Sequence, residues 1–174
     1  MTHELGPLWS DGVEVGLLTG EDSICRFTPA GIEVAESGPS TALLPWDQIA
    51  GLSYTGPRKA GLVWQLPWLA LVNPRTTNDE RPPTVHLKVT MRGGAQQGFI
   101  LGRPTQAPFS SSESEVLDAV LKHLSSRGGL SVLGDAAAMN SLIPKLRDCR
   151  TWITPWVWTR TQALLTYAVP ARKS

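Results

Sequence analysis

In Val85-His86-Leu87-Lys88-Val89-Thr90-Met91, apolar and polar side chains alternate without a break. Successive side chains of a β-strand point to opposite faces, so this period of two predicts a strand with one buried face and one solvated face. The residues that follow, Arg92-Gly93-Gly94-Ala95, predict a hairpin turn into a second strand at Gly98-Phe99-Ile100-Leu101. An antiparallel sheet is therefore expected in this part of the chain.

Strand-like segments also occur between this hairpin and the N-terminus. Short apolar or β-branched segments are separated there by Gly, Pro and Asp, the residues that form turns. Together with the hairpin they predict about seven strands before residue 103, in the segments 13–18, 24–27, 32–34, 42–44, 46–54 and 64–72.

The hydrophobic period changes to that of a helix at Ser110. Ser112 and Glu115 have the spacing of a capping box, and a stripe of apolar residues follows before Gly128-Gly129 ends the helix: Val116, Leu117, Val120, Leu121 and Leu124. A second helix is expected from Asp135, with Pro144 kinking or restarting it.

A last helix is expected from Thr154-Pro155 to about Tyr167, because Thr followed by Pro is typical of a helix start. The run from Trp152 to Trp158 is also compatible with an extended conformation.

Two segments in the middle of the predicted sheet resemble a known family. The stretch Phe27-Thr28-Pro29-Ala30-Gly31-Ile32-Glu33-Val34, followed by Leu44-Pro45-Trp46-Asp47-Gln48-Ile49-Ala50-Gly51-Leu52, resembles the bacterial pleckstrin-homology-like (PH-like) and GRAM-like domains. The resemblance covers about residues 13–127. It implies a bent antiparallel barrel in which Trp46 plugs one end and Ile49 re-enters the core.

The expected fold is therefore α+β and mainly β. A PH-like barrel of about seven strands, capped by an amphipathic helix, is expected over residues 1–129. A helical, Trp-rich C-terminal extension is expected over residues 130–174, packed on that domain or on a partner.

Composition excludes several classes of protein. The chain has 174 residues, of which 41% are hydrophobic and 18% charged, and seven tryptophans are available for a core, so a wholly disordered chain is excluded. The net charge of +1 is unlike the strong basic excess of a dedicated nucleic-acid binder.

The sequence also predicts where in the cell the protein is found. Met1 to Ser10 lacks the basic and apolar regions of a signal peptide, and the longest uncharged apolar stretch, Ala60 to Pro74, is shorter than the roughly 20 residues of a spanning helix. The two cysteines, Cys25 and Cys149, are too few for a disulfide scaffold. A cytoplasmic protein is expected.

Charge is unevenly distributed along the chain. Residues 1–56 carry eight acidic side chains and one basic one, whereas residues 144–174 carry six basic and one acidic. Such asymmetry is compatible with contact between two parts of one chain, with a contact between two copies, or with a basic tail for an anionic partner.

Motifs for catalysis, metal binding and cofactor binding do not occur. The sequence has no Gly-x-Ser-x-Gly, His-Glu-x-x-His, Gly-x-Gly-x-x-Gly or phosphate-loop pattern. His3, His86 and His123 are expected on the surface, and Cys25 in a strand, pointing inward. We therefore expect no catalytic, cofactor-binding or metal-binding residue, and no enzymatic activity.

Two groups of residues are candidates for an interaction site. Arg58 and Lys59 lie in a glycine-rich loop, and an aromatic and basic cluster follows near the C-terminus: Arg150, Trp152, Trp156, Trp158 and Arg160. Large aromatic rings on a terminal extension are expected to be buried, either against the domain or against a partner.

Two functions remain open. The favoured one is a non-enzymatic PH-like interaction module that binds a protein partner or a second copy of itself. The alternative is a peripheral membrane or anionic-ligand module that uses the basic, Trp-rich end. The loop Thr19-Gly20-Glu21-Asp22 is acidic where phosphoinositide-binding relatives are basic, which disfavours phosphoinositide binding there.

Overall fold

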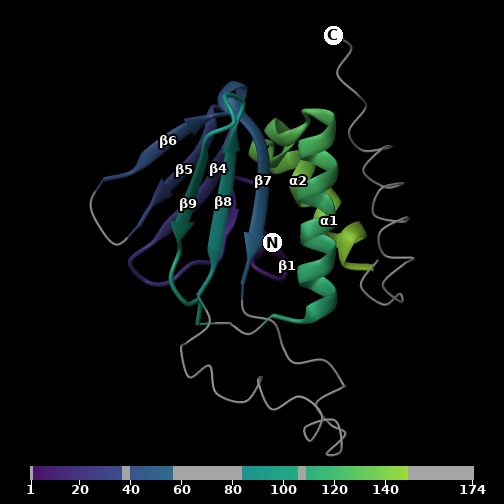
Figure 1. Ribbon diagram of the computed structural model, residues 1–174. Coiled ribbons are helices and arrows are strands. Elements are labelled where there is room, and N and C mark those ends of the chain that lie inside the picture. The colour runs from purple at the N-terminus through teal and green to yellow at the C-terminus, as the bar shows by residue number, and fades with distance from the viewer. Residues whose placement is uncertain (1, 37–39, 57–83, 106–108, 149–174) are drawn as a thin grey trace, which may run out of the picture.

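The computed structural model of the chain describes residues 2–36, 40–56, 84–105 and 109–148. Within these ranges nine strands precede two α-helices, α1 (Ser111–Arg127) and α2 (Ala136–Asp148) (Figure 1). The strands are β1 (His3–Leu5), β2 (Leu8–Ser10), β3 (Val15–Leu17), β4 (Ile24–Thr28), β5 (Gly31–Ala35), β6 (Ala42–Pro45), β7 (Ile49–Thr55), β8 (His86–Met91) and β9 (Gln96–Ile100). The predicted α+β class is confirmed.

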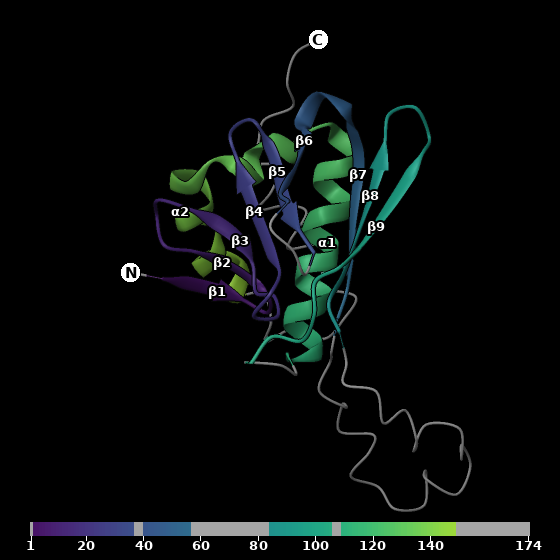
Figure 2. The same cartoon turned by 90° about the vertical axis from the view of Figure 1, so that its left-hand side faces the viewer.

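The strands form two antiparallel sheets, and in each sheet neighbours in sequence are neighbours in space. Strands β1 to β6 make one sheet and β7, β8 and β9 make the other. Figure 2 shows the two sheets splayed apart, with the helices across one side. No strand pair joins the two sheets within the described ranges, so the expected barrel is not closed there.

The hairpin of β1 and β2 was not predicted. Leu5 stands opposite Leu8, which leaves a two-residue turn in which Gly6 has a φ of 58°. Such a turn favours glycine at its first position. The two strands are three residues each, too short to show a period, and their Leu5 and Leu8 side chains are buried. The strand expected at 64–72 lies outside the described residues.

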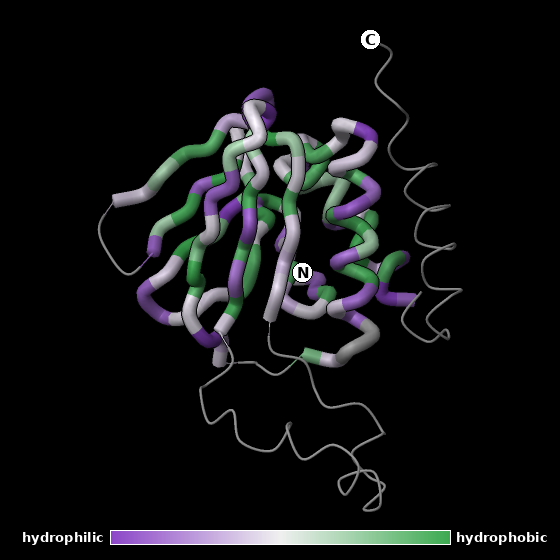
Figure 3. The backbone as a smooth tube through the Cα atoms, viewed as in Figure 1, coloured by the Kyte–Doolittle hydropathy of each residue, from purple (hydrophilic) through white to green (hydrophobic). Residues whose placement is uncertain are grey.

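The predicted strand around residues 85–91 is confirmed. Val85, Leu87 and Val89 are buried, His86 and Lys88 are exposed, and this alternation is visible along β8 in Figure 3. The predicted hairpin turn is also present, because Gly94 has a φ of 85° between β8 and β9.

Helix α1 begins two residues earlier than the predicted capping box. Its N-cap is Ser110, whose hydroxyl accepts the Glu113 N–H at 3.2 Å, so the Ser-x-x-Glu pair is Ser110 and Glu113. The predicted end is confirmed, because Gly128 closes the helix with a φ of 66°. Asp135 starts α2 as expected, accepting the Ala138 N–H at 3.0 Å, and Pro144 lies inside that helix.

The helices complete a core shared with both sheets. Helix α1 packs on β7 and β1, α2 packs on β1 and β2, and the 3-10 helix η4 (Leu130–Gly134) packs on β4 and β5. Residues on both sides of position 129 therefore belong to one buried cluster, among them Leu117, Leu121, Leu133 and Ile143. Among the described residues, neither helix has the length and apolar character of a membrane-spanning segment.

Trp46 lies where the six-stranded sheet leads into the three-stranded sheet. This residue begins the 3-10 helix η1 (Trp46–Gln48), its ring is half-buried, and it packs on Phe27 with ring centroids 6.2 Å apart. Ile49 is buried, as expected, and the pairing of β7 with β8 shifts register between Ile49 and Gly51.

Candidate functional site

A row of residues crosses the six-stranded sheet on the face that points away from the core. Each member stands directly opposite the next on the neighbouring strand: Glu4, Trp9, Gly16, Arg26, Glu33 and Leu43. Trp9 lies between the buried Leu8 and Ser10, so its own side chain points outward. The row therefore gives this outer face an aromatic ring, charges and an exposed leucine.

Gly16 lets the Trp9 ring lie against strand β3. A Cβ added to Gly16 would come within 3.0 Å of a Trp9 ring atom and within 2.6 Å of the Cys25 carbonyl oxygen. Any other residue would push the ring away from the sheet or distort the pairing of β3 with β4. The close approach of the Trp9 ring and of the Cys25 carbonyl oxygen therefore explains why position 16 is glycine.

The charges in the row are partly paired. Arg26 Nε lies 3.6 Å from Glu14 Oε2, and both side chains are 47% exposed. An exposed pair of this kind contributes at most about 1 kcal/mol to stability. Arg26 also stands opposite Glu33 on β5, so one guanidinium is placed next to two carboxylates.

A groove opens where this outer face meets the start of α2. Its volume is about 670 Å³. Its accessible apolar lining comes from Val13, Pro29 and Ala136, because the side chains of Val15 and Phe27, which also line it, are buried. The charged residues at its rim are Glu14, Arg26, Glu33 and Asp135. We call this surface the outer groove. Three carboxylates and one guanidinium give its rim a net negative charge.

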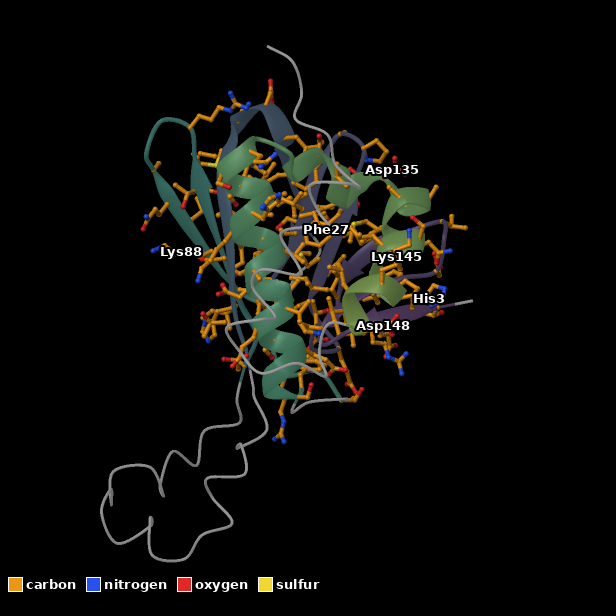
Figure 4. The ribbon with its side chains drawn as sticks, turned by 90° about the vertical axis from the view of Figure 1, so that its right-hand side faces the viewer. His3, Phe27, Lys88, Asp135, Lys145 and Asp148 are labelled. Carbon is orange, nitrogen blue, oxygen red and sulfur yellow. The ribbon has the colours of Figure 1, made fainter. Side chains whose placement is uncertain are left out.

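Backbone contacts hold the two walls of the outer groove in place. A Cβ on Gly134 would lie only 2.1 Å from the Thr28 carbonyl oxygen, so η4 meets the end of β4 through backbone atoms. That contact places Asp135 beside β4, and the carboxylate is fixed there because it caps α2. Figure 4 shows Asp135 at the start of α2, with Phe27 deeper in the molecule.

A short turn positions Glu14 on the opposite wall. The Asp11 carboxylate accepts the N–H groups of Val13 at 2.8 Å and of Glu14 at 2.7 Å. These hydrogen bonds, that from Glu14 first, lower the pKa of Asp11. Asp11 therefore stays ionised and keeps the turn before Glu14 in one conformation.

A second hollow of about 460 Å³ adjoins the outer groove at Pro29 and Ser131. Its charged lining residues are Asp47 and Arg92, and the half-buried Trp46 forms one wall. The opposite charges balance each other, so this hollow prefers no ionic ligand.

The structure does not describe the interaction residues that the sequence predicted. Arg58 and Lys59 lie outside the described residues, as do all five of the C-terminal cluster: Arg150, Trp152, Trp156, Trp158 and Arg160. Their grouping into one site stays a prediction.

Two of the titratable side chains singled out in the sequence are buried. Cys25 points inward as predicted, and burial raises the pKa of its thiol to about 12, so the reactive thiolate is not formed near neutral pH. His123 was expected on the surface, but it is only 6% exposed. Burial, and then the nearby Arg127, lower the pKa of its imidazole.

The residues of the outer groove were not predicted as a site. The acidic character of residues 1–56 was visible in the sequence, but Glu14 and Glu33 are far apart along the chain and Asp135 lies a hundred residues further on. Only the packing of η4 on β4 brings them together. Within the described ranges, no three His, Cys, Asp or Glu side chains are close enough to hold a metal ion.

Comparisons with protein-family models, with curated proteins and with solved structures give no match for this chain.

Proposed function

We propose that this protein is a non-enzymatic interaction module of the PH-like type, which binds a basic segment of a protein partner in the outer groove. The observation that carries the proposal is the set of three carboxylates, Glu14, Glu33 and Asp135, placed around a groove that also has accessible apolar lining. A lysine or arginine side chain suits the rim, and a neighbouring apolar side chain suits the accessible apolar lining at Val13, Pro29 and Ala136.

The charge of the described body supports a cationic partner. Its residues include thirteen acidic and eight basic side chains. A negative surface attracts a basic segment over several ångströms and slows the approach of an anionic one. Charges at an exposed rim contribute mainly to the rate of association, and burial of the apolar lining at Val13, Pro29 and Ala136 adds to the affinity.

The PH-like assignment is supported by the order of the elements. Strands β3 to β9 are seven antiparallel strands, each next to its neighbour in sequence within its sheet, and α1 follows them. About seven antiparallel strands followed by one amphipathic helix is what the resemblance over residues 13–127 implies, although the expected barrel is not closed within the described ranges. The β1–β2 hairpin and α2 are then additions to the domain, and the outer groove lies between α2 and the strands. A cytoplasmic location belongs to the same proposal.

A pair of labelled peptides tests the groove on the full chain. One peptide carries two lysines beside a leucine and a phenylalanine, and the other has glutamates in place of the lysines. The basic peptide should bind more tightly in fluorescence anisotropy, and its affinity should fall as salt rises, because the rim charges are exposed.

Two double variants distinguish binding in the outer groove from a general effect of the protein's negative charge. The double variant Glu33→Gln with Asp135→Ser removes two charges from the rim, and serine still caps α2. Its affinity for the basic peptide should be about tenfold lower, or about 1.4 kcal/mol. In Glu21→Gln with Asp22→Asn, the same charge is removed from an exposed turn at the other end of β4, and the affinity should change less than twofold. Equal losses in both double variants would contradict the groove.

Vesicle flotation examines the alternative function. If the chain floats with phosphatidylserine vesicles but not with phosphatidylcholine vesicles, and neither peptide binds, the membrane module that uses the basic, Trp-rich end replaces this proposal.

A further inference from the structure

Strand β9 is an edge strand with one side open. Among the described residues it pairs with β8 alone, and Figure 2 shows the β8–β9 hairpin projecting beyond the other labelled strands and helices, with β9 on its outside. The other edges are covered or shortened within the described ranges. Strand β7 contacts α1, whose Ser125 hydroxyl accepts the Leu52 N–H, β1 contacts α2, and β6 ends after four residues at Pro45.

Hydrogen bonds identify which backbone groups of β9 face outward. The Leu101 N–H donates to the Val85 carbonyl oxygen at 2.7 Å, toward β8, whereas the Ile100 N–H donates to the Glu36 carboxylate, away from β8. Backbone groups alternate sides along a strand, so the groups of Gln96 and Gly98 also face away from β8. They are available for another strand.

The sequence of this edge lacks the usual protection against strand addition. Natural edge strands carry charged residues, proline or a bulge. Residues 93–102 contain no charged residue and no proline, Gln96 and Gly98 are exposed, and the Ile100 side chain is 56% exposed. An uncharged edge does not repel a second, identical edge.

Gly98 has no structural reason to be glycine. Its φ is not in the left-handed region, and a Cβ added there would meet no atom within 4 Å. Glycine inside a strand costs about 0.5 to 1 kcal/mol relative to alanine. Where neither backbone nor packing requires it, glycine in an edge strand allows another backbone to approach closely.

We infer that β9 pairs with β9 of a second copy of this chain, antiparallel and centred on Gly98. Gln96 of one copy then stands opposite Ile100 of the other, and the two three-stranded sheets join into one of six strands. The pairing is symmetric about a two-fold axis, as most homodimer interfaces are. The hydrogen bond from the Ile100 N–H to the Glu36 carboxylate must break before the second strand can pair there, so Glu36 limits the affinity of the dimer.

This surface is separate from the outer groove. Lys88 stands opposite Gly98 on β8, and Figure 4 shows Lys88 and Asp135 on opposite sides of the molecule. Failure of the dimer and failure of the groove are therefore distinguishable by separate variants.

Sedimentation equilibrium of the full chain tests the inference. The wild type should show a monomer–dimer equilibrium, and Gly98→Glu should weaken it at least about tenfold, because two like charges would meet at the axis. The fold should tolerate this change, because the new carboxylate lies opposite Lys88 and has open space. An unchanged circular dichroism spectrum and melting temperature would verify that.

Three further variants make the result specific. Gly98→Ser adds a small neutral side chain and Gly93→Glu adds the same charge in the hairpin turn, and both should keep the dimer within about threefold of wild type. Glu36→Gln should strengthen it. A wild type that stays monomeric at several hundred micromolar, or a dimer of equal strength in Gly98→Glu, would overturn the inference.

Discussion

The indole Nε1 of Trp46 donates a hydrogen bond to the carbonyl oxygen of Thr28 at 2.7 Å. The bond ties η1, which leads into the three-stranded sheet, to the end of β4 in the six-stranded sheet. The same carbonyl oxygen faces Gly134 of η4. Three segments that are far apart in sequence therefore meet at one backbone group, beside both hollows of the surface.

We expect Trp46→Ala to lower the free energy of unfolding by about 2 to 3 kcal/mol, below the 3 to 5 kcal/mol of a fully buried aromatic residue, because the ring is half-buried. Trp46→Phe keeps the contact with Phe27 and loses the hydrogen bond, so its cost should be about 1 kcal/mol. Urea unfolding measures both. Equal losses for the two variants would show that the hydrogen bond, and not the ring, is what stabilises this end.

Gly134→Ala should destabilise the protein by more than about 2 kcal/mol. Its new Cβ would lie 2.1 Å from the Thr28 carbonyl oxygen, so η4 would have to move away from β4. Gly93→Ala is the matched control, because a Cβ there meets nothing within 4 Å. If both variants melt at the wild-type temperature, η4 does not pack on β4 in solution.

The Ser125 side chain of α1 hydrogen-bonds to the backbone of β7, and removal of its hydroxyl should lower the free energy of unfolding. Its hydroxyl accepts the Leu52 N–H at 3.1 Å and donates to the Leu121 carbonyl oxygen at 2.7 Å. Ser125→Ala leaves that N–H without its acceptor, at a cost of about 1 to 2 kcal/mol, and the Leu52 amide should exchange faster with solvent. Ser126→Ala, one residue away and exposed, should change stability by less than about 0.5 kcal/mol. Unchanged exchange at Leu52 would contradict the contact.

His123 should make the fold sensitive to acid. Its pKa is lowered by burial, so below about pH 6.5 the unfolded chain binds a proton that the folded chain does not. Stability should therefore fall as the pH drops from 7 to 5. His123→Leu removes an imidazole whose Nε2 is buried without a partner, and should reduce this loss. Parallel stability curves for wild type and His123→Leu would show that His123 is protonated in the fold.

The local patterns predicted most of the described strands and both helices, but not the hairpin of β1 and β2. The alternation at residues 85–91 and the glycines after it predicted β8 and its turn, and Gly128 predicted the end of α1. The helix start was misplaced by two residues because serine occupies positions 110 to 112 in the sequence, and it is the Ser110 hydroxyl that accepts the Glu113 N–H. His123 was misplaced because a polar residue indicates an exposed helix face only where no other segment covers that face.

By itself, the sequence determined the α+β class, the antiparallel character of the strands and the turns, since each depends on neighbours a few residues apart. Only the tertiary structure decided that Glu14, Glu33 and Asp135 share one groove, that β9 is left open while α1 covers β7, and that Trp46 reaches Thr28. Those relationships join residues tens of positions apart. They depend on how sheets and helices pack to bury one common core, and no local pattern encodes that choice.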